Sequence, residues 1–390
     1  MKKILLYYNF SYPVGGGDYL PLLFAEELMK HCDVTLAVDL KSGFEKSTAF
    51  FGMDSVLVGL HVEQLMPEGY TLAGHTFLCS WHRSRRLKRL ARQADVCISA
   101  CNIIDFGKPG HHFINIIAFG NDGFADYVNH CRVPALKRLR RTIAGTILRS
   151  LFGMRSKRAI IRDPREHIYP NSAFVNRMMQ EFYSPFDATL FYPPTTFTAE
   201  EKHAPSRDPL KVVYIGRFNP KKGIPGIIGI VERSRTATGQ DLTLHLAGPQ
   251  DPGEYGVFIR KLVADKPWVK LVGPVYGEEK ERFLLSGTYA IHAERDEAFG
   301  IAVTEYLKAG CIPIVPDEGG TTEIVNFPAL TYHTDEDAAA ILTRLLREGS
   351  FHQEALMHCT ARAKVFSFET YMENQHRVLD RILAGADRTS

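Results

Sequence analysis

The sequence lacks several features that would assign it quickly to a class of protein. No apolar run approaches the roughly 20 residues that a helix needs to cross a bilayer. The first residues turn polar so soon that we expect a first strand there rather than a signal peptide. The seven cysteines are scattered, with no Cys-x-x-Cys pair, which argues against a disulfide framework and a zinc site. We therefore expect a cytoplasmic protein.

The two common glycine motifs of nucleotide-binding proteins are also absent. Gly15-Gly16-Gly17 follows a strand-like run at residues 3–8, but it fits neither Gly-x-Gly-x-x-Gly nor the Walker spacing. A helical stretch at 20–29 and a strand-like run at 34–38 complete a β-α-β unit. On these residues alone, the glycines are either a loop that needs unusual backbone angles or part of a binding site.

What is present is the composition of an ordinary globular protein. The chain has 390 residues, of which 45% are hydrophobic and 23% are charged. This length suggests two or three domains with enough apolar material for buried cores. Neither an internal repeat nor a low-complexity tract is visible.

Two basic segments lie behind the modest net charge of +3. Residues 81–92 carry six Arg and Lys and no acid, and residues 132–165 carry eleven against the single Asp163. Apolar residues recur in the second segment at helical spacing, which predicts a helix with one basic and one apolar face: Leu136, Leu139, Ile143, Ile147, Leu148 and Leu151. Such a helix can dock on an anionic membrane, or it can be a solvated basic face whose leucines pack on the domain core. Nucleic acid is not expected, because few aromatic residues are interleaved.

The most informative segment begins at Glu297 and contains a second carboxylate at Glu305. Gly300 and Gly310 bracket an apolar-periodic run, which predicts a short helix, and the apolar run at 311–315 predicts a buried strand. A helix start favours a phosphate group, and carboxylates accept hydrogen bonds from neighbouring hydroxyls. The pattern suits a pocket for a sugar and a nucleotide. The alternative is an amphipathic helix with two solvated glutamates.

A second candidate segment looks like an anion-binding loop. A strand-like run at 210–215 leads to Gly216-Arg217-Phe218, then to Lys222-Gly223 and a helix. Cations and free amides ahead of a helix bind anions well, although Arg217 and Lys222 alone could be solvated loop charges. Residues 318–323 contain paired glycines that would let a ligand approach the backbone. Together, these segments favour a ligand site.

In order and spacing, the segments resemble the retaining glycosyltransferases of family 4, which have the α/β GT-B fold of two Rossmann-like domains facing each other across a cleft. The resemblance covers most of residues 210–325 and rests on a set of motifs: Gly216-Arg217-Phe218, Lys222-Gly223, Leu246-Ala247-Gly248, Val272-Gly273, Glu297 to Glu305, Gly310 to Pro313, and Gly319-Gly320 with Glu323. It implies an acceptor-side domain at 1–192, a nucleotide-sugar domain at 196–365, and a C-terminal helix at 366–390 that crosses back to the first domain.

The resemblance also implies roles for individual residues. Arg217 and Lys222 would bind the donor diphosphate, and Glu297 the hydroxyls of the donor sugar, so these three form the implied catalytic set. The implied donor contacts are Gly16, Gly17, Gly216, Val275 near the nucleobase, Phe299, Gly300, and Glu305 at the ribose. On the acceptor side, the histidine that many relatives carry would be His112 or be replaced by Asn115. A histidine beside a strand can equally be structural.

The implied activity is retaining transfer of a sugar from a nucleoside-diphosphate sugar to a glycan or lipid-linked acceptor, in cell-envelope polysaccharide biosynthesis. Neither a cofactor nor a metal is implied, because cationic side chains can stabilise the departing diphosphate. Basic segments 81–92 and 132–165 would let a cytoplasmic protein bind the inner face of an anionic membrane. The alternatives are an epimerase or phosphorylase on the same fold and a non-catalytic partner subunit.

Overall fold

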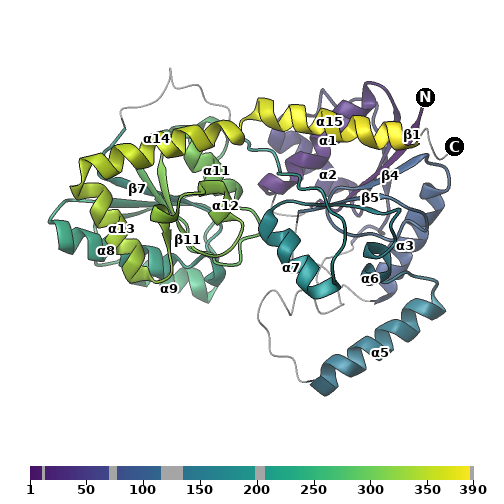
Figure 1. Ribbon diagram of the computed structural model, residues 1–390, viewed down its shortest axis with the longest axis horizontal. Coiled ribbons are helices and arrows are strands. Elements are labelled where there is room, and N and C mark those ends of the chain that lie inside the picture. The colour runs from purple at the N-terminus through teal and green to yellow at the C-terminus, as the bar shows by residue number, and fades with distance from the viewer. Residues whose placement is uncertain (11–13, 70–76, 116–134, 198–206, 387–390) are drawn as a thin grey trace. The chain divides into compact units, whose positions relative to one another are not determined.

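The computed structural model describes residues 1–10, 14–69, 77–115, 135–197 and 207–386 (Figure 1). The chain forms two compact units. Unit 1 contains Met1–Pro194 and Tyr371–Ser390, and unit 2 contains Thr195–Thr370. Each unit is built on one six-stranded sheet whose paired strands are parallel.

The sheet of unit 1 has the strand order β3-β2-β1-β4-β5-β6. Its strands are β1 (Lys3–Tyr8), β2 (Asp33–Val38), β3 (His61–Gln64), β4 (Val96–Ser99), β5 (His111–Ile114) and β6 (His167–Pro170). The helical elements are η1 (Gly16–Asp18), α1 (Tyr19–Met29), α2 (Lys41–Phe51), α3 (Phe77–Ala91), α5 (Ala135–Leu151), α6 (Lys157–Ile161), α7 (Ala173–Tyr183) and most of α15 (Phe368–Ala386).

The sheet of unit 2 has the order β12-β11-β10-β7-β8-β9. Its strands are β7 (Lys211–Ile215), β8 (Thr243–Ala247), β9 (Val269–Gly273), β10 (Tyr289–Ile291), β11 (Ile312–Pro316) and β12 (Thr331–Tyr332). The helical elements are η4 (Pro220–Lys222), α8 (Ile224–Thr238), α9 (Glu254–Val263), α10 (Gly277–Leu285), α11 (Ile301–Lys308), α12 (Thr321–Val325), η5 (Pro328–Leu330), α13 (Asp335–Arg347) and α14 (Gly349–Val365).

Both sheets have the strand order of the Rossmann fold, and the central strands show why. In β1 five of the six residues are buried, and in β11 all five are buried. A strand buried on both faces needs helices on either side, which parallel β-α-β crossovers supply. The prediction of two Rossmann-like domains is therefore confirmed.

In such sheets a crevice opens where the chain reverses its direction of strand addition, outside the carboxyl ends of the strands. In unit 2 this point lies between the neighbouring strands β7 and β10, and in unit 1 between β1 and β4. The loop that follows β7 and the loop that follows β10 therefore begin at the same edge of the sheet. These loops carry Arg217, Lys222 and Glu297.

The C-terminal helix α15 packs on unit 1. The side-chain amide of Gln375 donates a 3.1 Å hydrogen bond to the carbonyl of Leu23 in α1. The ring of Tyr371 lies 5.8 Å from that of Phe191. Both contacts are buried, so α15 belongs to the core of unit 1 although it follows unit 2 in the sequence.

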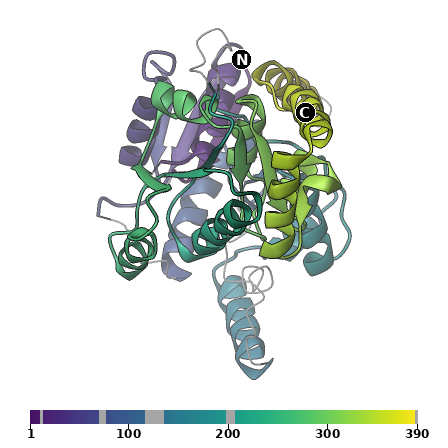
Figure 2. The same ribbon diagram turned by 90° about the vertical axis from the view of Figure 1, so that its left-hand side faces the viewer.

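The basic amphipathic helix predicted within 132–165 is α5, which stands apart from the sheet of its own unit in both views (Figures 1 and 2). Residues 132–134 lie outside the described residues. From Ile143 onward the apolar side chains are exposed: Ile143 50%, Ile147 54%, Leu148 36% and Leu151 75%. In this part of the helix the apolar side chains do not pack on the domain core. The alternative of a solvated basic face whose leucines pack on that core is therefore wrong for residues 143–151.

The C-terminal end of α5 is joined to α3 by aromatic contacts. The ring of Phe152 lies 5.3 Å from Phe77 and 5.2 Å from Trp81. The ammonium of Lys88 donates a 2.7 Å hydrogen bond to the carbonyl of Gly153. Within the described ranges, no helix combines the length and the apolar character that a membrane crossing requires.

Candidate functional site

Glycines at the carboxyl ends of β7 and β8 let two loops of unit 2 touch backbone to backbone. A Cβ atom on Gly248 would lie 1.9 Å from the carbonyl oxygen of Gly216, and Gly248 has a φ of 141°. A Cβ atom on Gly216 would lie 2.5 Å from the hydroxyl of Tyr214. A side chain at either position would collide with these atoms, so the close approach of the two loops requires glycine.

Lys222 connects the loop after β7 with the loop after β10. Its Nζ lies 2.5 Å from Oε2 of Glu297 and 2.5 Å from Oε2 of Glu294. Gly223, in the left-handed region with a φ of 61°, ends the 3₁₀ turn η4 that presents Lys222. Arg217 is exposed, and among the described residues its side chain has no ion pair. The predicted cation Lys222 and the predicted carboxylate Glu297 are thus in contact, while Arg217 remains accessible to a ligand.

The charges in this cluster shift one another. Burial opposes the charge on Lys222, but Glu297 and Glu294 outweigh it and raise the pKa of the ammonium well above its usual value. Burial would raise the pKa of Glu297, but Lys222 and His292 lower it to about 2. Burial and the neighbouring Glu297 raise the pKa of Glu294. The two carboxyl groups differ in proton affinity although they share one cation.

His292 lies beneath this cluster, directly after β10. Its Nε2 is 3.5 Å from Oε2 of Glu297, and burial lowers its pKa to about 4, so the ring is neutral near pH 7. Neither ring nitrogen of His292 nor the hydroxyl of Tyr214 has a hydrogen-bond partner among the described residues. A buried polar atom without a partner costs about 1–3 kcal/mol. This cost is typical of a site shaped for something other than stability.

Sequence reasoning missed Glu294 and His292. The available signal was the density of acids directly after β10, where Glu294, Asp296 and Glu297 lie within four positions. Acids before a helix are common on solvated surfaces, so this signal did not separate Glu294 from its neighbours.

The helix predicted between Gly300 and Gly310 is α11, and Gly300 is its N-cap with a φ of 106°. A Cβ atom on Gly300 would lie 2.7 Å from Cγ2 of Thr321. Phe299 is buried, with its ring 5.9 Å from that of Phe366. The loop before α11 is therefore anchored directly after Glu297.

Glu305 is held by a different cation from Glu297. It is buried within α11, and its Oε1 accepts hydrogen bonds of 2.7 Å from Lys280 Nζ and 2.7 Å from the Thr196 hydroxyl. The alternative of two solvated glutamates is wrong, because Lys222 holds Glu297 and Lys280 holds Glu305. Lys280 had no signal in the sequence, since it comes from α10.

The paired glycines after β11 pack against the Glu297 loop. The amide of Gly320 donates a 2.8 Å hydrogen bond to the carbonyl of Glu297. A Cβ atom on Gly320 would lie 2.3 Å from the carbonyl oxygen of Ala298, and one on Gly319 would lie 2.4 Å from that of Arg295. Val275, buried between β9 and α10, lies on another loop that starts at the carboxyl edge of the sheet. The predicted motifs of unit 2 thus start at one edge.

The remaining candidates lie in unit 1. Gly16 and Gly17 belong to η1, the next described element after β1, and the Tyr8 hydroxyl at the end of β1 donates a 3.0 Å hydrogen bond to Asp18 of η1. Asn115 follows β5, and its side-chain amide donates a 2.7 Å hydrogen bond to the carbonyl of Ala100. It is partly exposed.

His112 is a structural residue. Its ring is fully buried, with Nε2 2.9 Å from Oε2 of Glu166 and Nδ1 accepting a 3.3 Å hydrogen bond from the amide of Ile104. The ring also stacks on Phe106. Because both nitrogens are occupied and the ring is inaccessible, His112 is the structural histidine that the sequence left as an alternative, and not an acceptor-side group.

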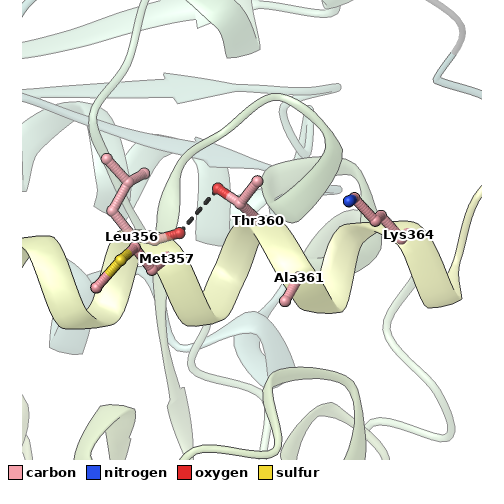
Figure 3. Close-up of a pocket in the computed structure, with 5 residues that line it drawn as sticks. All are labelled: Leu356, Met357, Thr360, Ala361 and Lys364. Atoms are coloured by element: carbon pink, nitrogen blue, oxygen red, sulfur yellow. Dashed lines mark hydrogen bonds between the residues drawn. The ribbon is translucent and has the colours of Figure 1, made fainter.

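Two surface hollows lie elsewhere. Five residues of α14 line one of about 370 Å³: Leu356, Met357, Thr360, Ala361 and Lys364 (Figure 3). The Thr360 hydroxyl donates to the Leu356 carbonyl at 2.8 Å, and Lys364 is the charged residue among the five. The other hollow, of about 590 Å³ on α3, is lined by His82, Arg85, Arg86, Arg89 and Arg92. None of these arginines has an ion pair with a described residue. The described chain contains no cluster of three metal-ligating side chains.

Residues 196–364 match the family model described as Glycosyl transferases group 1. No curated protein matches the chain. Among solved structures, sucrose-phosphate synthase from Thermosynechococcus elongatus is similar with a TM-score of 0.70 at 16% identity, over 99% of this chain and 100% of that chain.

Two further solved structures are similar over nearly their whole length. HepE from Anabaena, in complex with UDP and glucose, has a TM-score of 0.67 at 14% identity, over 98% of this chain and 100% of that one. WaaG, a glycosyltransferase involved in lipopolysaccharide biosynthesis, has a TM-score of 0.65 at 13% identity, over 97% and 99%. At these identities the likeness shows the fold, which is the GT-B arrangement of two Rossmann-like domains.

Proposed function

We propose that the chain is a glycosyltransferase that transfers a sugar from a nucleoside-diphosphate sugar to a glycan or lipid-linked acceptor, because residues 196–364 match the family model described as Glycosyl transferases group 1. The transfer retains the anomeric configuration and needs no metal ion. The contact between Lys222 and Glu297 at the switch point of unit 2 carries this proposal. It joins a group suited to a diphosphate with a group suited to sugar hydroxyls.

The cations have the chemistry that the leaving group requires. Negative charge develops on the diphosphate as the bond to the sugar breaks, and fixed cations stabilise it most where water is scarce. Lys222 is four-fifths buried, and Arg217, on the same loop, is exposed. We assign the diphosphate to this pair, in the role that a metal ion would otherwise have.

The carboxylates have the chemistry of polyol recognition. Glu297 keeps its charge at neutral pH because Lys222 and His292 lower its pKa to about 2, so it can accept hydrogen bonds from the donor-sugar hydroxyls. Glu305 is fixed through Oε1 by Lys280 and Thr196, which suits it to the ribose. Retention follows if the departing diphosphate assists the incoming hydroxyl on the same face of the sugar.

A lipid-linked acceptor would explain the surface of unit 1. The exposed apolar residues of α5 and the arginine-lined hollow of α3 are joined through Phe152, which contacts Trp81. Apolar side chains beside cations are the composition of surfaces that bind anionic membranes. We propose that this surface brings the enzyme to an acceptor held in the inner face of a membrane, as in cell-envelope glycan synthesis.

A donor screen tests the proposed function. Thermal unfolding is measured with UDP-sugars and GDP-sugars, and we expect one class to stabilise the protein by about 2.7 kcal/mol at a hundredfold excess over its dissociation constant. Lys222→Ala should abolish the stabilisation, whereas Lys266→Ala, which removes a surface partner of Glu232, should keep it. Stabilisation by neither class, with no nucleoside diphosphate released in the presence of lipid extract, would contradict the proposal.

A further inference from the structure

Glu294 has no role in the site as described so far, yet it is one of the two carboxylates that pair with Lys222. Its carboxylate is as close to Lys222 Nζ as that of Glu297, at 2.5 Å. Burial and the neighbouring Glu297 carboxylate raise the pKa of Glu294. One ammonium and two carboxylates give the cluster a charge of −1 when all three are ionised. A negative cluster repels the diphosphate that Lys222 is proposed to bind.

The groups that face Glu294 come from three elements. Lys222 comes from η4, Glu297 from the loop after β10, and Tyr214 from β7, while His292 from that loop lies next to Glu297. Near pH 7 the buried His292 is neutral and the buried Tyr214 keeps its proton, because burial lowers the pKa of the first to about 4 and raises that of the second. Lys222 stays charged and Glu297 stays ionised. Glu294 is therefore the group of this cluster that can change its charge.

We propose that Glu294 is a positioning residue that takes up one proton when a nucleoside-diphosphate sugar binds, and thereby frees Lys222 for the diphosphate. The inference rests on the proposed function of the site. The hydrogen bond from Lys222 to Glu294 breaks, and the ammonium then donates to a diphosphate oxygen while keeping Glu297. A proton from the solvent adds to the Glu294 carboxylate, and the new hydroxyl donates to Glu297. The cluster changes from −1 to neutral.

The direction of this change follows from the contacts. Lys222 is the cation that stabilises the ionised form of Glu294. The bound diphosphate draws Lys222 away from Glu294 and adds negative charge nearby. Both effects raise the proton affinity of Glu294. Binding that takes up a proton strengthens as the pH falls, by up to about tenfold per pH unit while the group titrates.

Calorimetry with UDP-glucose and GDP-mannose tests the inference. Each is titrated into the full chain near pH 7 in two buffers of different ionisation enthalpy, which gives the number of protons taken up. We expect net uptake by the wild type, none by Glu294→Gln, and wild-type uptake by Glu348→Gln, whose exposed carboxylate pairs with Arg344. At pH 8, Glu294→Gln should bind at least as tightly as the wild type, because the neutral amide removes the repulsion.

The outcomes separate this inference from the function on which it rests. Binding of either sugar nucleotide by the wild type without proton uptake, or with equal uptake in Glu294→Gln, overturns the role of Glu294 and leaves the proposed function standing. Weaker binding by a folded Glu294→Gln at every pH would also overturn it, since it would show a merely structural role. If the wild type binds neither compound at any pH, the proposed function and the inference fall together.

Discussion

At the scale of single residues, the site is defined by two lysines and their carboxylates: Lys222 pairs with Glu294 and Glu297, and Lys280 pairs with Glu305. The sequence was sufficient to single out Arg217, Lys222 and Glu297, because glycines and charged residues that follow a strand form a local pattern in the sequence. It was not sufficient for Glu294 and Lys280, whose importance comes from contacts between different elements. The sequence offered two interpretations of His112, and only burial could decide between them.

Glu297→Ala should lower turnover by more than about tenfold and leave the fold intact. The variant loses the carboxylate that we propose accepts hydrogen bonds from the sugar hydroxyls, and the loss of one such contact in the transition state costs up to several kcal/mol. Turnover is measured as nucleoside diphosphate released, with circular dichroism as the check on folding. Glu348→Ala serves as a control, and equal rates for Glu297→Ala and the wild type would remove Glu297 from the site.

Gly300→Ala should destabilise the protein by about 1–3 kcal/mol, because its φ of 106° is unfavourable for any side chain and a Cβ atom would lie 2.7 Å from Thr321 Cγ2. The matched control is Gly349→Ala at the start of α14, where nothing lies within 4 Å of the new atom. Denaturant unfolding should show the control within about 1 kcal/mol of the wild type. Similar losses in both variants would show that the backbone of Gly300 is not constrained.

At the scale of elements, the strands and helices that carry the motifs were predicted closely, and α13 shows where the limit lies. Asp335, Glu336 and Asp337 precede an alanine-rich run, a pattern that predicts the start of a helix, and they form the first turn of α13. The cap itself is Thr334, whose hydroxyl accepts a 3.2 Å hydrogen bond from the amide of Asp337. The run of acids in the sequence indicates the first turn of the helix. The residue that caps the helix, Thr334, is identified only by its extended backbone angles in the structure.

The helix α5 should carry membrane binding. Replacing Arg138, Arg140 and Arg141 with glutamine should weaken binding to vesicles of phosphatidylcholine and phosphatidylglycerol by about 3 kcal/mol, or roughly a hundredfold, at about 1 kcal/mol for each cation. Nucleotide affinity should not change. Sedimentation with the vesicles measures the effect. Neutralising Arg233, Lys261 and Lys270 of unit 2 is the control.

The apolar face of α5 gives an independent test of the same element. Ile147→Glu and Leu151→Glu should reduce binding to these vesicles without loss of stability, because both side chains are already exposed, at 54% and 75%. A loss of stability would instead mean that the face packs within the protein. Wild-type binding that is absent, or that does not weaken with added salt, would contradict the membrane proposal.

At the scale of the whole molecule, both units have the same strand order, but the sequence predicts unit 2 in more detail than unit 1. Unit 2 has glycine and charge motifs after most of its strands, whereas unit 1 offers one β-α-β pattern and a glycine run without a known fingerprint. The path of α15 onto unit 1 depends on buried contacts such as that of Gln375. Contacts between residues so distant in the sequence leave no local pattern.

The stability of the chain should fall as the pH is lowered from about 6.5 to 4. His292 in unit 2 is buried and His111 in unit 1 is partly buried, and burial lowers their pKa values to about 4 and about 3, so both rings are neutral near pH 7. Below the unfolded pKa of about 6.5, the unfolded chain binds protons that the folded chain does not, which costs up to about 1.4 kcal/mol per pH unit for each histidine. Unfolding measured across this range tests it.

The contribution of one histidine can be isolated. His292→Leu should make the decline shallower, because it removes a buried ring that binds a proton only after unfolding. Carboxylates such as Glu297, with a pKa of about 2, add their loss of stability only below about pH 4.5, so the two effects occur in different ranges. A stability that is constant between pH 6.5 and 5 would be inconsistent with buried neutral histidines.

The most direct test of the central claim is a crystal structure of the protein with the sugar nucleotide that stabilises it. We expect the diphosphate to contact Arg217 and Lys222, the donor sugar to contact Glu297, and the ribose to contact Glu305. A ligand bound elsewhere, or one at this edge of the sheet whose diphosphate touches neither cation, would contradict the account.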